Sequence, residues 1–151
     1  MAFTRSADAA TVLCMSGSRF RGLAQVNVFA SDVAAARDWY TPVLGTEPYF
    51  QRPDAAEPAY VEFRLGDSQD EFGIVSSLYR PPGASDEPGG VIARWHVDDI
   101  RAVVTDLIDR GAREWEPVME RGEEFVTASV LDPFDNILGL IQSPHYLSGL
   151  R

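Results

Sequence analysis

Four polar residues in the middle of the sequence could take part in chemistry together: Glu62, Arg64, Arg94 and His96. Histidine exchanges a proton near neutral pH, so His96 could act as a general acid or base, or as a hydrogen-bond partner of a ligand. We favour ligand contact for His96, and Glu62 is the second acid/base candidate. Glu62 with Arg64 or Arg94 would form an internal ion pair or a clamp for a ligand carboxylate or amine, and the sequence leaves both open.

The chain has only two histidines and one cysteine. An iron site of two histidines and a carboxylate would therefore need both His96 and His145. His145 lies near the C-terminus, where we expect a surface or dimer-contact histidine. Cys14 cannot form an intrachain disulfide and we assign it no role.

Alternation along the predicted strands separates a packed face from a mixed face, because successive strand residues point to opposite sides. Val26, Val28 and Ala30 share an apolar face, as do Val91, Ala93, Trp95 and Val97. The mixed face is either solvated or, if the sheets are cupped, the wall of a ligand cavity. Its predicted members are Gln25, Asn27, Phe29, Tyr60, Glu62, Arg64, Ile92, Arg94, His96, Thr127 and Ser129.

The elements that position these strands occur twice along the chain. Asp32 and Asp99 are N-cap candidates 67 residues apart, and each follows a strand-like run and precedes a helical segment, 33–40 and 100–110. The second segment is apolar at i, i+3, i+4, i+7 and i+8. Pro42 is expected to end or kink the first helix before a closing glycine. Two more strands follow each helix, which predicts strand, helix, strands, twice.

Prolines and glycines divide the chain, because they resist regular structure. We predict an N-terminal extension that is poorly ordered, a first module, a linker, a second module and a tail, at residues 1–22, 23–79, 80–90, 91–147 and 148–151. The charged segments 51–58 and 114–124 are expected to be mobile loops.

Composition excludes two classes of partner. The formal net charge of −10 and the pI near 4.5 argue against nucleic acid, which requires clustered Lys and Arg. No apolar run approaches the roughly 20 residues that span a bilayer, and no signal-peptide core is present. The sequence predicts a cytoplasmic protein.

Two motifs resemble those of a known family. The run from Val26 to Asp32, with the helical segment from Ala36 to Gly45, resembles the opening strand and helix of the glyoxalase, bleomycin-resistance and extradiol-dioxygenase superfamily. Residues 132–136 resemble its DPxGN turn, with Asp135 in place of the glycine. The resemblance covers about residues 23–147 and implies an α+β fold of two tandem βαβββ modules, whose cupped mixed sheets carry helices on the convex side.

The resemblance also implies where a metal would bind. In metal-dependent members one ligand lies seven residues before the aspartate that starts each helix, and a second, normally Glu, lies on each module's last strand. These positions hold Gln25, Ile92, Gly73 and Gly139. One amide oxygen cannot replace the ligands of a divalent ion, so we predict no metal, no cofactor and none of the family's metal-dependent reactions. Gly73 and Gly139 are expected to leave volume for an organic ligand and complete the predicted cavity.

The sequence therefore predicts a metal-independent protein that binds a small organic ligand, similar to the bleomycin-resistance branch, for example to sequester an antibiotic or metabolite. That branch also implies a homodimer. One alternative is a metal-independent lyase or isomerase that uses Glu62 or His96 as acid/base, and the sequence leaves enzymatic activity open. The other is a regulatory or interaction module whose cavity has collapsed around Phe29, Phe125 and Ile92.

Overall fold

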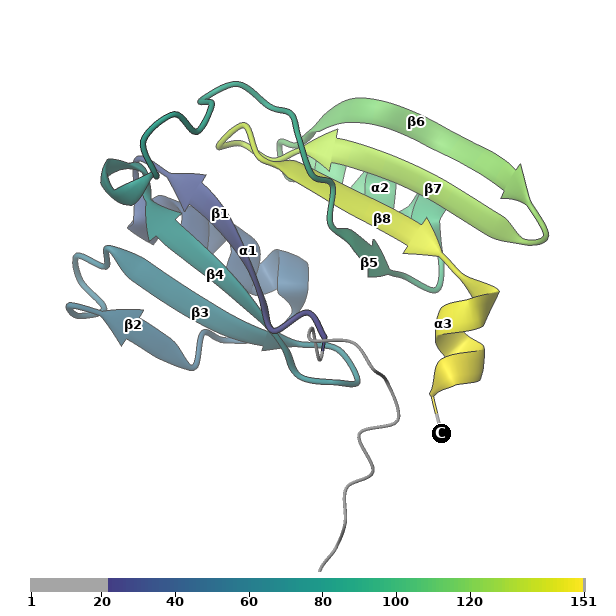
Figure 1. The fold of residues 1–151 in the computed structure, drawn as a ribbon, viewed down its shortest axis with the longest axis horizontal. Helices are drawn as coiled ribbons and strands as arrows, with labels where there is room; N and C mark the ends of the chain where they lie inside the picture. Colours follow the sequence, from purple (N-terminus) through teal and green to yellow (C-terminus); the bar gives the residue numbers. More distant parts are fainter. Residues whose placement is uncertain (1–21, 151) are drawn as a thin grey trace, which may run out of the picture.

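The computed structural model describes residues 22–150, which form two modules with the same order of elements (Figure 1). The first module contains β1 (Gln25–Ala30), α1 (Val33–Leu44), β2 (Phe50–Arg52), β3 (Tyr60–Leu65) and β4 (Asp70–Ser76). The second contains β5 (Arg94–His96), α2 (Ile100–Asp109), β6 (Arg113–Gly122), β7 (Phe125–Leu131) and β8 (Ile137–Gln142). A short 3-10 helix η1 (Ser77–Tyr79) precedes the linker, and α3 (Pro144–Gly149) follows β8. The predicted order of elements is confirmed.

Each module forms one four-stranded mixed sheet. The strand orders are β1-β4-β3-β2 and β5-β8-β7-β6, with β1 parallel to β4 and β5 parallel to β8. The other neighbours are antiparallel. Both α1 and α2 lie on the same side of the two sheets (Figure 1). We call the opposite side the open face, and the predicted α+β fold is confirmed.

The two helices begin in the same way. The side chain of Asp32 accepts a hydrogen bond from the Ala35 amide at 2.9 Å, and that of Asp99 from the Ala102 amide at 3.0 Å. Gly45 closes α1 in the left-handed conformation. The helix runs through Pro42 instead of ending there, because a proline in the last turn removes only one backbone hydrogen bond.

Two strand predictions were wrong. Residues 113–122 form β6, a ten-residue strand, where a mobile loop was expected. This edge strand is exposed along most of its length. It therefore carries charged residues and lacks the alternation of apolar and polar residues that marks a half-buried strand. Conversely β5 spans only three residues, and Val91, expected to pack against the helices, is 93% exposed in the preceding loop.

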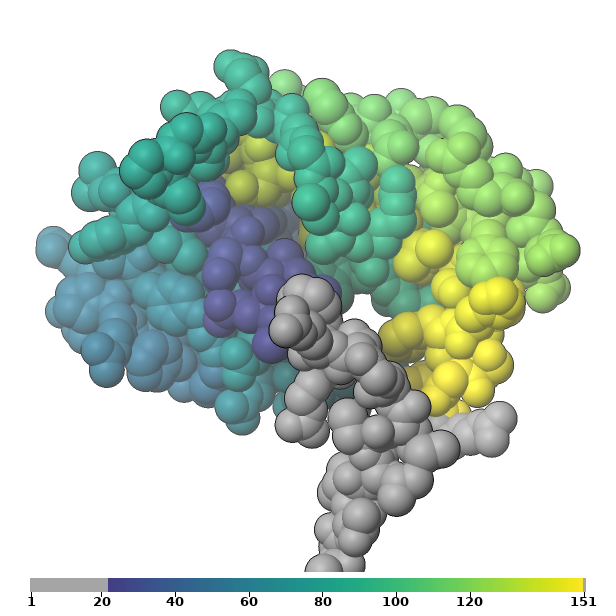
Figure 2. Space-filling view, viewed as in Figure 1, coloured from purple at the N-terminus to yellow at the C-terminus, as the bar shows by residue number. Residues whose placement is uncertain are grey.

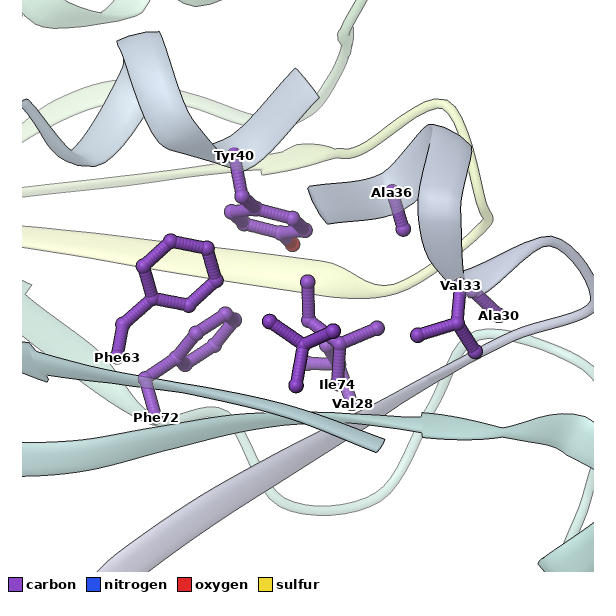
Figure 3. Close-up of a cluster of buried hydrophobic side chains, with 9 residues drawn as sticks. Val28, Ala30, Val33, Ala36, Tyr40, Phe63, Phe72 and Ile74 are labelled. Carbon is purple, nitrogen blue, oxygen red and sulfur yellow. The ribbon is translucent and has the colours of Figure 1, made fainter. Parts of the chain in front are cut away.

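The apolar core lies between the sheets and the helices. In the first module Val33, Ala36 and Tyr40 of α1 point onto Phe63, Phe72 and Ile74 of the sheet (Figure 3). The second module buries Ile100, Val104 and Leu107 of α2 against Val130 and Leu140. Trp39 and Trp95 pack against both clusters, where their large rings bury apolar surface. The modules therefore share a continuous apolar layer.

A buried polar cluster also joins the modules. Asp132 is fully buried and accepts hydrogen bonds from the Tyr40 hydroxyl at 2.5 Å and from the Phe134 and Asn136 amides, both at 2.8 Å. The Asn136 side chain pairs with the backbone N–H and C=O of Phe29 on β1, at 3.2 and 2.9 Å. Asp135 keeps the turn left-handed at φ 66°, a conformation that Asp tolerates. This cluster is the module clasp.

Two predictions fall outside the residues that the structure describes. The expected disorder of the N-terminal extension and the position of Cys14 concern residues 1–21, which lie outside them. None of the helices in residues 22–150 is long and apolar enough to cross a membrane.

Candidate functional site

The open face of the first module carries a network of neutral and acidic side chains. Gln25 of β1 donates through Nε2 to the Tyr60 hydroxyl at 2.7 Å and to Glu62 Oε2 at 3.0 Å. Tyr60 also donates to Glu62, and Asn27 Nδ2 donates to Gln25 Oε1 at 3.0 Å. Both ends of the Gln25 amide are therefore occupied by protein partners.

Glu62 has no close cationic partner in this network. It is 7% exposed, and Arg64 instead lies 3.8 Å from Glu71 and over the ring of Tyr49. Burial, followed by the nearby Glu71 carboxyl, raises the pKa of Glu62 above its ordinary value. Of the two readings left open by the sequence, the ion pair of Glu62 with Arg64 or Arg94 does not form, and Glu62 instead accepts hydrogen bonds from neutral groups.

The open face of the second module neutralises its carboxylate with a cation. Arg94 Nη2 lies 2.9 Å from Glu116 Oε2, and the buried Ser129 hydroxyl donates to the same oxygen at 2.7 Å. These hydrogen bonds, Ser129 first and then Arg94, lower the pKa of Glu116. Thr127 accepts a hydrogen bond from Arg121 at 2.9 Å. Sequence reasoning missed Glu116 because it lies on the unrecognised strand β6.

Protein atoms fill the space beside the two open-face glycines, so the expected extra ligand volume is wrong. A Cβ at Gly73 would collide with the Asn27 Oδ1 atom and approach Tyr60 Cε2 to 3.1 Å. A Cβ at Gly139 would meet the Ala93 carbonyl oxygen at 2.5 Å and Ile92 Cγ2 at 2.7 Å. Small residues stand here because neighbouring protein atoms approach closely.

The four positions that would hold the family's metal do not fit one. Gln25 already uses its amide oxygen for Asn27, and Gly73, Ile92 and Gly139 offer no side-chain ligand. Within residues 22–150, no cluster of three or more His, Cys, Asp or Glu side chains is arranged for a metal.

His96 is held between β8 and α3. Its Nδ1 accepts the Ser143 amide at 3.2 Å, and its ring stacks on Tyr146 with centroids 4.6 Å apart. The Nε2 atom is buried without a hydrogen-bond partner and lies 3.5 Å from Asp98 Oδ1. His145 instead contacts Phe125 edge-on at 4.9 Å.

Two grooves follow β1 between the modules and share Leu23, Gln25 and Val26. The first, of 760 Å³, is bounded by α3, and we call it the α3 groove; Figure 2 shows a hollow beside that helix (yellow). The second, of 560 Å³, is bounded by the linker, which crosses the same view (teal), and we call it the linker groove. Both volumes lie in the range of small-molecule sites.

The grooves collect seven of the predicted cavity residues. The α3 groove is lined by Gln25, Arg64, Arg94 and His96, and the linker groove by Gln25, Asn27, Phe29 and Ile92. Tyr60 lines a separate depression of 680 Å³ at the edge of the first sheet. Five predicted cavity residues line neither the two grooves nor this depression: Glu62, Gly73, Thr127, Ser129 and Gly139. Sequence reasoning missed Tyr146 of α3 and the linker residues, since composition identified the linker only as a module junction.

The chain belongs to the Glyoxalase/Bleomycin resistance protein/Dioxygenase superfamily, whose sequence model matches residues 22–140. A search of the curated proteins finds no match.

Solved structures share the fold at low sequence identity. A protein from Agrobacterium tumefaciens is 17% identical, with a TM-score of 0.66 over 82% of this chain and 98% of that one. TnmS3, an antibiotic binding protein from Streptomyces sp. CB03234, is 21% identical, with a TM-score of 0.61 over 83% and 98%. A glyoxalase/bleomycin resistance protein from Catenulispora acidiphila is 23% identical, with a TM-score of 0.54 over 80% and 96%. These likenesses describe the fold alone.

Proposed function

We propose that this protein binds a small organic molecule, without a metal ion, in the grooves that follow β1 between its modules. The observation that carries the proposal is the pair of grooves of 760 and 560 Å³, with Gln25 shared between them. Apolar walls with a few polar groups are typical of ligand sites. The protein's family and its structural similarity to an antibiotic binding protein support a ligand of this kind, such as an antibiotic or metabolite.

His96 is the proposed ligand contact in the α3 groove. His96 lines the α3 groove together with Arg94 and Tyr146, so a ligand bound there would lie beside its imidazole ring. Tyr146 holds the ring by stacking and donates its hydroxyl to Asp67 of the first module at 2.9 Å. The groove thus has a polar ring held in a fixed position beside its apolar walls.

The test is a small-molecule screen followed by amide chemical shifts of the isotope-labelled protein. We expect ligands to shift amides of β1 and residues 92–96 together. Replacement His96→Ala removes a ring that lines the α3 groove and should weaken such a ligand about ten-fold. His145→Ala is the matched control, because that histidine lines neither groove, and should leave affinity unchanged. Ligands that shift only other regions, or equal effects of the two variants, would contradict the proposal.

A second candidate function is metal-independent proton transfer by Glu62. The observation that favours it is the buried carboxyl with a raised pKa, which suits a general acid or base. Under this alternative, Glu62→Gln abolishes turnover of a bound metabolite and leaves its affinity within about two-fold. If the parent protein turns over no bound metabolite and Glu62→Gln only weakens binding, the enzyme alternative is contradicted. The collapsed-cavity alternative is disfavoured by the two grooves.

The proposal includes a homodimer and keeps the predicted cytoplasmic location. Large apolar side chains are exposed on and beside the edge strands β2 and β6 and near the linker, and such exposure is typical of interfaces. They are Tyr49, Phe50, Leu78, Tyr79, Val91, Trp115 and Met119. Sedimentation equilibrium should give twice the monomer mass of 16.6 kDa. A monomer at micromolar concentration would refute the dimer and leave the grooves within one chain.

A further inference from the structure

Arg80, the first residue after η1, places its side chain against β1. Its guanidinium carbon lies 4.6 Å from the centroid of the Phe29 ring. Its Nη1 atom donates to the Ser85 carbonyl at 2.7 Å, and the buried Nε lies 3.1 Å from Asp86 Oδ1 without hydrogen-bond geometry. An aromatic face, a carbonyl and a carboxylate thus surround one cation. We call Phe29, Ser85 and Asp86 the cation cage.

The cation cage belongs to the wall of the linker groove. Phe29, Arg80, Ser85 and Asp86 all line that groove. Arg80 is the one basic residue among its lining side chains, which also include the acidic Glu87 and Asp135. Asp135 is paired with Arg113 at 2.5 Å, whereas the Asp86 side chain is 90% exposed. A cation in this groove would therefore meet the Asp86 carboxylate beside the Phe29 ring once Arg80 has moved away.

We propose that the cation cage is a binding subsite for the guanidinium, amidinium or alkylammonium group of a ligand, and that Arg80 fills it while the ligand is absent. The inference rests on the proposed function, because it names the chemical class of a ligand for the same grooves. Exchange of one cation for another keeps the cation–π contact and the carboxylate contact, while the arginine returns to water. A neutral ligand gains neither contact, so the subsite selects for positive charge.

Benzamidine and benzamide test the subsite, because they have nearly the same shape and differ in charge. Arg80→Ala should bind benzamidine about ten-fold more tightly than the parent, the size of one cation–π contact with its ion pair. Benzamide should bind equally to both. Arg52→Ala is the matched control: Arg52 lies 5.5 Å from the Phe50 centroid on β2, outside the linker groove, and its loss changes the net charge equally.

Two further variants keep the result interpretable. Arg80→Met retains the apolar stem of the side chain and should show the same gain if Arg80→Ala does not fold. Asp86→Asn added to either variant should abolish most of the gain. The proposal is overturned if benzamidine binds the Arg80 variants no better than the parent, or if benzamide or the Arg52 variant gains equally. A lower melting temperature without a gain would define Arg80 as a brace for the linker only.

Failure of the subsite and failure of the proposed function are distinguishable. A screen that finds neutral ligands on β1 while benzamidine shows no gain removes the subsite and keeps the groove function. If the Arg80 variants bind benzamidine more tightly beside Phe29 and Asp86, but no screen finds a ligand near Gln25 or His96, the subsite is supported and the wider proposal is refuted.

Discussion

The two modules share one topology but surround the carboxyl groups of their open faces with different partners. In the first module Glu62 is bound by the neutral donors Gln25 and Tyr60. In the second module Glu116 is paired with Arg94 and bound by Ser129. The pKa of Glu62 is therefore raised by burial, and that of Glu116 is lowered by its partners. Equivalent sheets do not imply equivalent chemistry on their open faces.

The turns that join the last two strands of each module differ as strongly. The second module's turn buries Asp132 in the module clasp. The first module's turn is exposed, and its side-chain link to the other module is Tyr146 to Asp67 at 2.9 Å. The second turn thus contributes to stability, whereas the first bounds the α3 groove through Gly66 and its neighbours.

The largest expected effect is the difference in unfolding free energy between substitutions in these two turns. Asp132→Ala leaves the Tyr40 hydroxyl and two turn amides without their acceptor, so we expect a loss of about 3–5 kcal/mol in unfolding free energy. Asp67→Ala breaks one exposed hydrogen bond and should change it by less than about 1 kcal/mol. Denaturant unfolding of both variants gives the comparison. Equal losses would contradict the assignment of the clasp to one turn.

Substitution of the two open-face glycines should give a smaller difference in unfolding free energy between the modules. Gly139→Ala forces a Cβ onto the Ala93 backbone carbonyl, which cannot move freely, and should lower the unfolding free energy by about 1–3 kcal/mol. Gly73→Ala meets the Asn27 side chain, which can rotate, and should cost less than about 1 kcal/mol. Adding Asn27→Ala should relieve the Gly73 variant. If Gly73→Ala is the more harmful change, the space beside it is not filled as described.

The smallest effect is a pair of opposite pH dependences, each about 1 kcal/mol or less. The folded pKa of Glu62 is raised, so its stabilisation is present below the unfolded pKa and is lost as pH rises through the folded value. Glu62→Gln should therefore gain stability relative to the parent from about pH 4 to pH 7. The pKa of Glu116 is lowered, so Glu116→Gln should be less stable at neutral pH, and its deficit should shrink as pH falls through the folded value. Unfolding curves across pH with slopes of the same sign would contradict the comparison.

Much of the fold was predictable because local rules govern it. The capping aspartates Asp32 and Asp99 and the helical spacing from Ile100 to Ile108 marked both modules. Strand β6 was not predictable, because an exposed edge strand with Pro117 lacks a hydrophobic alternation. The module clasp joins Tyr40 to a residue 92 positions away, a distance at which spacing rules carry no information.

The site was predictable to a lesser extent. Alternation correctly identified Gln25, Asn27 and Phe29 as one face of β1, and the grooves contain all three. The glycine positions were misjudged because the sequence does not tell whether a small residue leaves a cavity or admits a neighbouring atom. The linker's part in the groove depends on where Arg80 turns, which composition cannot specify.

Ligand affinity measured with and without metal ions tests the central claim most directly. A ligand whose amide shifts map to β1 and residues 92–96 is titrated by calorimetry in excess chelator, and then with zinc, nickel, manganese or iron(II) in place of the chelator. Metal-independent binding in the grooves predicts dissociation constants that agree within about two-fold. Binding abolished by the chelator and restored about ten-fold or more by one of these ions would contradict the account.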